Sequence, residues 1–351
     1  MSLFLGAMRQ HIHGHKELSE HKDVVEVKAG KEVWIPLFAM HSANFDVAVN
    51  VGDHVYVGTK LAQCNDRMIV PIYSSVSGVV KAIDAKCMHA TLKPVMHIVI
   101  ENDEQYKSIQ AFEPIDYKQA SKSELVEFMK NAGIVGCGGA CFPTYIKYSS
   151  DAEIHTLIIN AVECEPYITS DYKMVEAYVN EMLLGVDAMK KMAGAKHAWI
   201  AIKVSHPELI EHVKQACVAF EGIAVKAVPD VYPMGWEKTL VKEILGKTYS
   251  RLPSEVGAIV NNASTAIAFA NALTKGMPLT QKIVTVSGDG VNNPVNVLVR
   301  IGTKAQEVVE ATGGYAADEV MLISGCLLYT SFMKNIRKGI AGVLPPDTYS
   351  I

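Results

Sequence analysis

The sequence predicts a multi-domain α/β protein with an all-β N-terminal domain, a central α/β domain and a small C-terminal β-grasp domain. At about 150 residues per domain, its 351 residues suggest two or three domains. Short alternating segments run from Val33 to about Glu101, strand and helix patterns then alternate, and strand patterns return after Pro278. The expected divisions are an arm of residues 1–30, domains of residues 31–112, 113–278 and 279–325, and a tail of residues 326–351.

The composition excludes several classes of protein. The 33 Lys+Arg against 37 Asp+Glu give a formal net charge of −4, which argues against a nucleic-acid-binding protein, because such proteins rely on a basic face. No stretch approaches the roughly 18 consecutive apolar residues that span a bilayer, and the N-terminus lacks a signal-peptide pattern. We therefore expect a cytoplasmic protein, at most peripheral on the inner face of the cell membrane.

Cysteine and histidine patterns predict no metal site. The seven cysteines are odd in number and include no C-x-x-C pair, which argues against a disulfide framework, structural zinc and ferredoxin-type clusters. The arm carries His11, His13, His15 and His21, and alternating histidines can chelate a metal. Without a carboxylate or cysteine recognised at ligand spacing, we interpret this segment as a solvated arm.

The N-terminal domain is expected to be a barrel-sandwich of short strands. Val49–Gln63 and Val70–Ile83 each contain turn residues between β-branched runs, so each is predicted to be a strand pair with a tight reversal. The layout resembles the lipoyl and biotinyl carrier fold, in which a hairpin presents a lysine. Here that hairpin carries Arg67, whose guanidinium is not a nucleophile at neutral pH, so a carrier function is disfavoured.

The central domain shows the alternation that is typical of a largely parallel sheet with helices on its faces. A helix is predicted near Ser121, with Ser123 and Glu127 ahead of its apolar stripe. The expected strands are Thr156–Asn160, Ala198–Val204 and Ile223–Val228, and the expected helices are Met174–Met192, Pro207–Phe220, Glu237–Leu245 and Ser264–Leu273.

The C-terminal region has the pattern of a compact β-α-β unit. The segments KIVTVSGDG and PVNVLVRIGT predict strands, Lys304–Thr312 a short helix, and Val320–Ile323 another strand. This pattern favours a small β-grasp domain. Residues 326–351 carry no clear periodicity.

The strongest local signal is the glycine-rich segment from Gly133 to Thr144. Its glycines suggest positive φ angles or a close ligand, and a glycine-rich turn before a helix can bind an anion, with Lys147 adding charge. The segment differs from the dinucleotide-binding fingerprint, because it follows a helix and has Cys141 at the last position. An anion site and a tight structural turn both stay open.

A second signal, Asn160–Lys173, follows a buried strand. The carboxyl ends of parallel strands bind ligands in open α/β sheets, and Glu163 and Glu165 would face the same way there. These carboxylates could accept hydrogen bonds from a ribose or a flavin. The alternative is a helix cap, for which Ser170 and Asp171 are better suited.

A third signal comprises Val231–Leu240 and Val260–Leu273. Asn261 and Asn262 end a strand and begin a helix, so their side chains could cap that helix or bind a ligand. Both interpretations stay open at this point.

Taken together and in order, these motifs resemble the RnfC family. The segments are GGACFPT with a following lysine, NAVECEP, YPMGWEKTL, an asparagine before a helix, and TVSGD followed by PVNVLVRIGT. RnfC belongs to bacterial ion-translocating electron-transport complexes, as one of their subunits. The chain is similar, more distantly, to the flavin-bearing, NADH-oxidising subunit of respiratory complex I. The resemblance covers nearly the whole chain and makes the C-terminal domain SLBB-type.

This resemblance implies a Rossmann-like central domain that binds FMN and NADH. Hydride transfer to the flavin would then be followed by release of single electrons, with the cofactor supplying the chemistry. By position, it assigns Gly136, Gly138, Gly139, Ala140, Phe142 and Lys147 to the isoalloxazine and phosphate, Asn160, Glu163 and Glu165 to the flavin ring and nicotinamide side, Tyr232, Gly235 and Glu237 to the facing wall, and Asn261 and Asn262 to the phosphate.

The sequence departs from the family pattern in two ways. Cys141 replaces a glycine, and no iron–sulfur motif is present, so a cluster would have to lie in a missing C-terminal region or in a partner. In this the chain resembles a branch associated with proline reductase as its electron-transfer protein. We hypothesise that Cys141 is a redox-active thiol, with Cys137 as its candidate partner. A small residue that fills a gap is the alternative.

Two classes of function follow. The first is a flavin-dependent electron-transfer protein that oxidises NADH, or relays electrons, through FMN to a partner reductase or to other proteins of a membrane complex. The second is a non-catalytic docking subunit that keeps the fold but has lost its flavin through the change at Cys141. Visible flavin that NADH bleaches distinguishes them.

Overall fold

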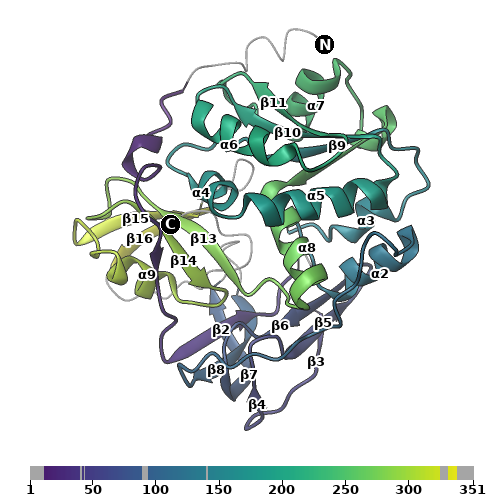
Figure 1. Cartoon of the computed structure of the whole chain (residues 1–351). Helices are drawn as coiled ribbons and strands as arrows, with labels where there is room; N and C mark the ends of the chain where they lie inside the picture. Colours follow the sequence, from purple (N-terminus) through teal and green to yellow (C-terminus); the bar gives the residue numbers. More distant parts are fainter. Residues whose placement is uncertain are drawn as a thin grey trace.

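The computed structural model describes residues 12–39, 42, 44–88, 94–139, 141–324 and 331–337. The all-β region lies at one end of the molecule, the α/β region at the other, and the C-terminal sheet beside both (Figure 1). His11, Ala140 and most of the tail lie outside the described residues.

The central sheet has four parallel strands in the order β11-β10-β9-β12. These strands are β9 (Thr156–Asn160), β10 (His197–Lys203), β11 (Ile223–Val228) and β12 (Ala258–Asn262). Leu157, Ile158 and Ile159 are all fully buried, as expected for a strand that is covered on both faces. The polar residues Asn160, Lys203 and Asn262 therefore meet at the carboxyl edge of the sheet.

Helices cover both faces of this sheet. They are α2 (Lys122–Asn131), α3 (Tyr145–Tyr148), α4 (Ser170–Ala177), α5 (Val179–Ala193), α6 (Pro207–Cys217), α7 (Glu237–Leu245), α8 (Ala263–Lys275) and the 3-10 turn η2 (Pro253–Val256). Helices α5, α6 and α8 pack on the face of Leu157 and Ile159, and α7 packs on the face of Ile158. Gly185 permits the contact of α5 with α8, because a Cβ there would lie 2.0 Å from the Ala266 carbonyl oxygen.

Two helix predictions need correction. Ser121 is the N-cap of α2, as predicted, but its capping partner is Glu124 rather than Glu127. The single helix predicted over Met174–Met192 is two helices, α4 and α5, which are separated at Tyr178. The strands and the other helices of this domain lie where they were expected, within one to three residues.

The N-terminal domain is a sandwich of two antiparallel sheets, ordered β2-β8-β7-β4 and β3-β5-β6. Its strands are β2 (Glu32–Pro36), β3 (Phe45–Val47), β4 (His54–Val55), β5 (Lys60–Asn65), β6 (Ile69–Tyr73), β7 (Gly78–Met88) and β8 (Pro94–Asn102). Apolar residues from both sheets, including Val33, Leu61 and Ile98, form one core. Alternating inward-facing residues thus close the sandwich.

The two strand pairs predicted in this domain are wrong. In each block the two strands lie in opposite sheets, because β4 pairs with β7 while β5 pairs with β3 and β6. The hairpins are instead β5–β6, with Asn65 opposite Ile69, and β7–β8. The turn residues mark places where the chain crosses between sheets. The predicted hairpin that carries Arg67 is present.

The C-terminal region contains β13 (Gln281–Val286), β14 (Val295–Arg300), α9 (Ala305–Ala311), β15 (Glu319–Ser324) and β16 (Ser331–Arg337). Strand β16, which pairs with β15, lies within the tail where no periodicity was seen. Strand β1 (Val25–Glu26) of the arm pairs with β14 in parallel. The arm is therefore part of the C-terminal sheet.

The arm is docked rather than solvated, which corrects the expectation from sequence. Ser19, just after the 3-10 turn η1 (Lys16–Leu18), is fully buried, and its hydroxyl lies 2.8 Å from the hydroxyl of Thr169. Asn296 of β14 donates to Thr169 Oγ1 at 2.8 Å and to the Ser19 carbonyl at 3.1 Å. A buried polar network therefore joins the arm, the start of α4 and the C-terminal sheet.

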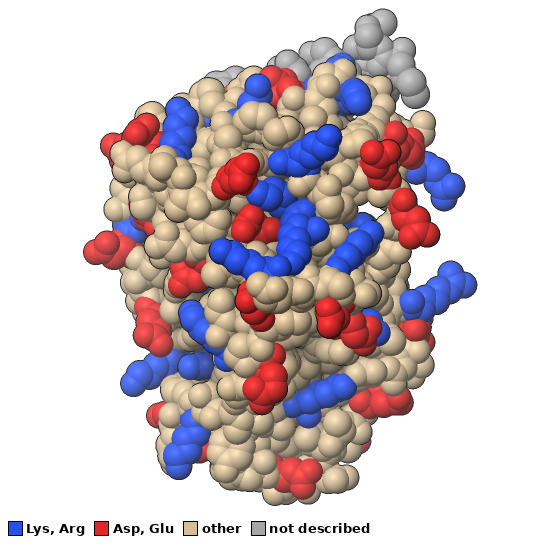
Figure 2. All heavy atoms as spheres, turned by 45° about the vertical axis from the view of Figure 1, so that its right-hand side comes forward, with Lys and Arg blue, Asp and Glu red and all other residues tan. Residues whose placement is uncertain are grey.

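The charged surface agrees with the near-balance of the composition. Basic side chains gather in the upper half of the face drawn in Figure 2, but acidic side chains lie among them. Among the described residues, no helix is both long and apolar enough to cross a membrane.

Candidate functional site

The glycine-rich segment folds as a closed loop between α2 and α3. Gly136 N–H donates to the Phe142 carbonyl at 2.8 Å, and Val135 and Pro143 form an antiparallel bridge. Gly139 has a φ of 115° and Cys141 a φ of 46°. Cys141 thus holds a left-handed conformation that favours glycine, the residue expected there from the family pattern.

This loop lies against the start of α8. Cys137 N–H donates to Thr265 Oγ1 at 2.9 Å, and a Cβ on Gly138 would lie 3.4 Å from Cβ of Asn262. Asn262 caps α8 by accepting from Ser264 N–H at 2.9 Å, so its cap interpretation is confirmed. Its Nδ2 donates to Asp171 at 2.6 Å.

Asn261 is separated from this cluster. Its side chain is buried and donates to the Tyr148 hydroxyl and to the Met189 sulfur, among the helices on one face of the sheet. The predicted pair of asparagines at one ligand is therefore not brought together, because successive residues of a strand point to opposite faces. Only Asn262 lies beside the glycine loop.

Lys147 and Glu237 are brought together, with Nζ and Oε2 4.0 Å apart. Lys147 donates to the Val260 carbonyl at 2.6 Å, and burial lowers the pKa of its ammonium while Glu237 opposes that shift. Glu237 also accepts from the Tyr249 hydroxyl at 2.8 Å. The lysine therefore spans from the glycine loop to the edge of β12.

The segment after β9 is held by a close backbone contact. Asn160 Nδ2 donates to the Gly235 carbonyl at 2.9 Å, and Asn160 Oδ1 accepts from Val162 N–H. A Cβ on Gly235 would lie 2.4 Å from the Val162 carbonyl oxygen and 3.0 Å from the Cys164 sulfur. Only glycine fits at position 235, which follows the cis peptide bond between Tyr232 and Pro233 by two residues.

Glu163 and Glu165 differ in their partners. Glu163 Oε1 accepts from Ser170 Oγ and Asp171 N–H, both at 3.0 Å, so Glu163 caps α4 and the two residues expected to cap it do not. Oε2 of Glu165 is buried and has no hydrogen-bond partner among the described residues. Burial raises the pKa of both carboxyls, and nearby Lys16 opposes that shift.

Lys16 is a residue of this site that sequence reasoning missed. Its Nζ donates to the Glu165 carbonyl at 2.7 Å and to the Ile168 carbonyl. Burial lowers the pKa of its ammonium, although Glu163 acts against that shift. No local sequence signal pointed to Lys16, because its partners lie about 150 residues away along the chain.

A polar cavity of 220 Å³ opens beside these groups at the carboxyl edge of the sheet. Its lining includes His13, Lys16, Cys164, Lys203, His206 and Tyr232. Lys203 Nζ lies 2.7 Å from Asp230 Oδ1, and burial, with Lys203 and Lys16 nearby, lowers the pKa of His206 to about 4. Burial raises the pKa of the Cys164 thiol to about 11, so this sulfur stays protonated at neutral pH.

The fold and this site define the chain as an α/β protein with a flavin-type domain between a barrel-sandwich and a β-grasp domain. The family described as Nuo51 FMN-binding domain matches residues 129–271, the RnfC barrel sandwich hybrid domain matches residues 9–105, and the SLBB domain matches residues 283–321. The predicted three-part fold class is confirmed by these matches.

The chain belongs to the RnfC family, as its resemblance predicted. It is 33% identical over 341 residues to the RnfC-type component of the proton-translocating ferredoxin:NAD(+) oxidoreductase complex of Clostridium ljungdahlii, covering 94% of this chain and 74% of that one. It is 31% identical to the equivalent component of the Na(+)-translocating complex of Acetobacterium woodii, with 90% and 73% covered.

One solved structure shares the fold. An NAD+-reducing [NiFe]-hydrogenase in the air-oxidised state superposes with a TM-score of 0.51 at 22% sequence identity. The match covers 64% of this chain and 47% of that chain. At this identity the likeness concerns the fold alone.

Two observations show that the site fits FMN. The buried oxygen of Glu165 lacks a partner among the described residues, so it can accept a hydrogen bond from an N–H of a ligand without first breaking a contact. The glycine loop presents bare backbone beside Asn262, where a close ligand is accommodated. Asn160 and Glu163, by contrast, already use their side chains to shape the segment that carries Glu165.

Proposed function

We propose that the chain binds FMN between the glycine loop of residues 133–144 and the segment of residues 160–168, and passes electrons between a nicotinamide dinucleotide and a partner protein. The unpartnered carboxylate oxygen of Glu165 carries this proposal. The match to an FMN-binding family over the residues that form both segments supports it. When bound, the flavin supplies exchange between two-electron and one-electron steps.

The residues of the chain would orient and enclose the cofactor. Glu165 would accept from the flavin ring, while Lys16 keeps its segment in place. Gly138 and Gly139 would let the ring approach the backbone, with Asn262 beside it. Lys203 and Lys16, both on the wall of the 220 Å³ cavity, favour the negative charge of a dinucleotide there.

The electron partner is proposed from the relatives. They are parts of ion-translocating ferredoxin:NAD(+) oxidoreductase complexes, so we propose that this chain docks with other subunits of such a complex or with a reductase, including proline reductase. Because no C-x-x-C pair occurs in the chain, we propose that the partner, or a region beyond residue 351, supplies any iron–sulfur cluster.

A reconstitution experiment tests the proposed function. We expect the purified chain to bind FMN and its visible flavin band to bleach when NADH is added without oxygen. Glu165→Gln replaces a charged acceptor with a neutral one and should weaken FMN binding about tenfold or more. Glu153→Gln, at an exposed carboxylate, is the matched control and should bind as the unaltered chain does. A chain that fails to bind FMN contradicts the proposal and favours a docking subunit.

We also propose that Cys141 is a redox-active thiol near the flavin. Its backbone holds a left-handed conformation and its side chain is partly exposed, whereas Cys137 is buried. Two thiols would lose two electrons and two protons to an acceptor as a disulfide forms. Iodoacetamide labelling across pH tests this idea, because a Cys141 that titrates like an ordinary thiol, near 8.5, contradicts it.

A further inference from the structure

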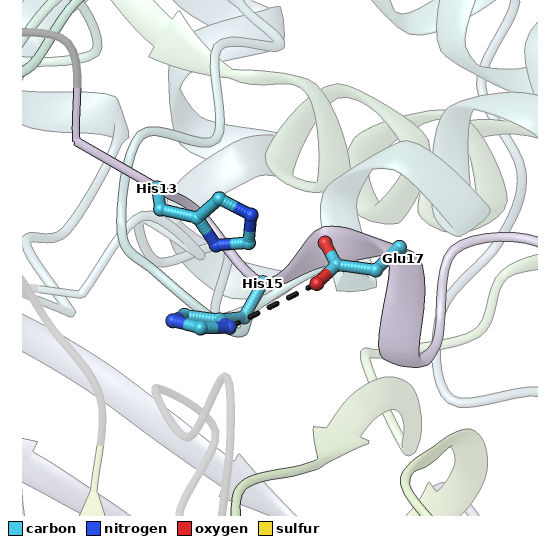
Figure 3. Close-up of side chains that lie close together, drawn as sticks. All are labelled: His13, His15 and Glu17. Carbon is cyan, nitrogen blue, oxygen red and sulfur yellow. Dashed lines mark ion pairs between the residues drawn. The ribbon is translucent and has the colours of Figure 1, made fainter.

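The docked arm brings three metal-binding side chains together outside the flavin site. One donor atom from each of His13, His15 and Glu17 lies within 4.8 Å of the others. Figure 3 shows the carboxylate of Glu17 turned toward the two imidazole rings. The alternating histidines were noted in the sequence, but the carboxylate two residues beyond His15 was overlooked.

The local backbone creates this cluster. His15 has a left-handed conformation, with φ 49° and ψ 31°, and immediately precedes η1. This bend places the ring of His13 edge-on to that of His15, with centroids 4.3 Å apart, and leaves His15 Nδ1 3.8 Å from Glu17 Oε1. An extended arm would instead spread alternate side chains along about 7 Å per pair of residues.

The cluster is held on a fixed support. The His15 ring stacks on Tyr167, with centroids 4.6 Å apart and planes 9° apart. On either side of His15, Gly14 accepts from Tyr167 N–H at 2.6 Å and Lys16 donates to the Glu165 carbonyl. These contacts reduce the conformational freedom that a ligand set must lose on binding a metal.

We propose that His13, His15 and Glu17 form a binding site for a divalent transition metal such as Zn²⁺ or Co²⁺. Two imidazoles and one carboxylate are a ligand set that these ions accept, with one further position open. Ligand atoms around a tetrahedral zinc lie roughly 3.3 Å apart, given bonds of about 2.0–2.1 Å. The present separations of up to 4.8 Å therefore close through rotation of side chains, two of which are exposed.

Cobalt binding to the full chain, freed of metal and of any affinity tag, tests this site. We expect one equivalent of Co²⁺ to bind, to be displaced by Zn²⁺, and to give visible difference bands without the near-ultraviolet absorption of cobalt–thiolate bonds. This spectrum separates the cluster from the seven cysteines. His15→Ala and His13→Ala should each weaken binding at least tenfold, and Glu17→Gln should weaken it several-fold.

His21→Ala is the matched control, because His21 lies in the same arm and its side chain is 77% exposed. It should leave Co²⁺ affinity within twofold of the unaltered chain. Thermal melting in EDTA checks that each variant is folded, and His13→Ala, at an exposed position, retains the Tyr167 contact of His15. The absence of saturable binding, a thiolate spectrum, or equal losses in H15A and H21A would overturn the proposal.

Discussion

The glycine loop and the segment of residues 160–168 form two sides of the same site but are held in different ways. The loop closes on itself through backbone contacts within a few residues, as between Gly136 and Phe142. The other segment depends on distant parts of the chain: Lys16 donates to its carbonyls, and Gly235 packs on its backbone. One side of the site is therefore a local motif, whereas the other is an assembly of remote elements.

The sharpest test of this difference is a methyl group placed on each side. Gly235→Ala puts a Cβ 2.4 Å from a backbone oxygen, and we expect it to lower the free energy of unfolding by about 1–3 kcal/mol, because neither backbone can move freely. FMN affinity should fall as well, since the Glu165 segment would be displaced. Denaturant unfolding and flavin titration measure the two effects.

Gly136→Ala is the control within the glycine loop. A Cβ there would meet its nearest atom at 3.5 Å, an ordinary contact, so we expect little change in the free energy of unfolding. If both variants lose equal stability, the two sides of the site are equally constrained and the contrast between them is wrong.

The second test removes the remote support of the carboxylate segment. Lys16→Met deletes two hydrogen bonds from an ammonium to carbonyl groups and leaves Glu163 and Glu165 without their nearby cation. We expect the free energy of unfolding at neutral pH to fall by about 1.5–3 kcal/mol, the range for charged hydrogen bonds. Chemical denaturation measures it.

Lys22→Met is the matched control for that test. Lys22 lies in the same arm and also donates to a carbonyl, that of Pro294, but at an exposed position. Its loss should therefore change stability by less than about 1 kcal/mol. Equal effects of the two variants would show that the segment does not depend on Lys16.

The same contrast explains what the sequence could predict. The periodicity of apolar residues located β9, β11 and α7 at their observed bounds, because each is a continuous element with one buried pattern. The motif around Gly139 predicted positive φ angles, which are a local property. Lys16, by contrast, has no pattern of its own, and its role appears only when the arm meets residues 165–168.

The corrections follow the same logic. The turns near Gly52 and Ser77 were recognised from local residues, but which strands pair across them depends on how the two sheets close over the Val33 and Leu61 core. Glu163 was correctly placed at the end of β9, yet its capping of α4 depends on the return of the chain at Ser170. Local chemistry was predictable, whereas the choice among partners was set by tertiary packing.

A third test uses pH to examine the buried carboxylate. Burial raises the pKa of Glu165 above its ordinary value of 4.5, so the folded state binds its proton more tightly than the unfolded state. This contribution stabilises the fold below about pH 4.5 and is lost as pH rises through the raised pKa. We expect Glu165→Gln to flatten this part of the stability curve, as measured by melting temperature from pH 4 to 8.

Glu255→Gln provides a control of opposite sign. Hydrogen bonds from the backbone N–H groups of Leu252, Ser250 and Arg251 lower the pKa of Glu255 below 4.5, so its contribution is present above that pH and is lost as pH falls. E255Q should therefore destabilise the chain at neutral pH, and the difference should shrink toward acid. If E165Q behaves in the same way, Glu165 is not desolvated as the structure indicates.

The smallest expected effect concerns the residue that separates the glycine loop from the family pattern. Cys141 has a φ of 46°, a conformation that costs an ordinary residue about 1–2 kcal/mol, while glycine adopts it freely but gains entropy when unfolded. Cys141→Gly should therefore raise the free energy of unfolding by about 0.5 kcal/mol and abolish any thiol redox step. Cys217→Ala, at a buried thiol outside the loop, is the labelling control. Retention of a strained cysteine where glycine is more stable would be expected if the sulfur takes part in electron transfer; a C141G chain that transfers electrons to its partner at an unchanged rate would show instead that Cys141 only fills space.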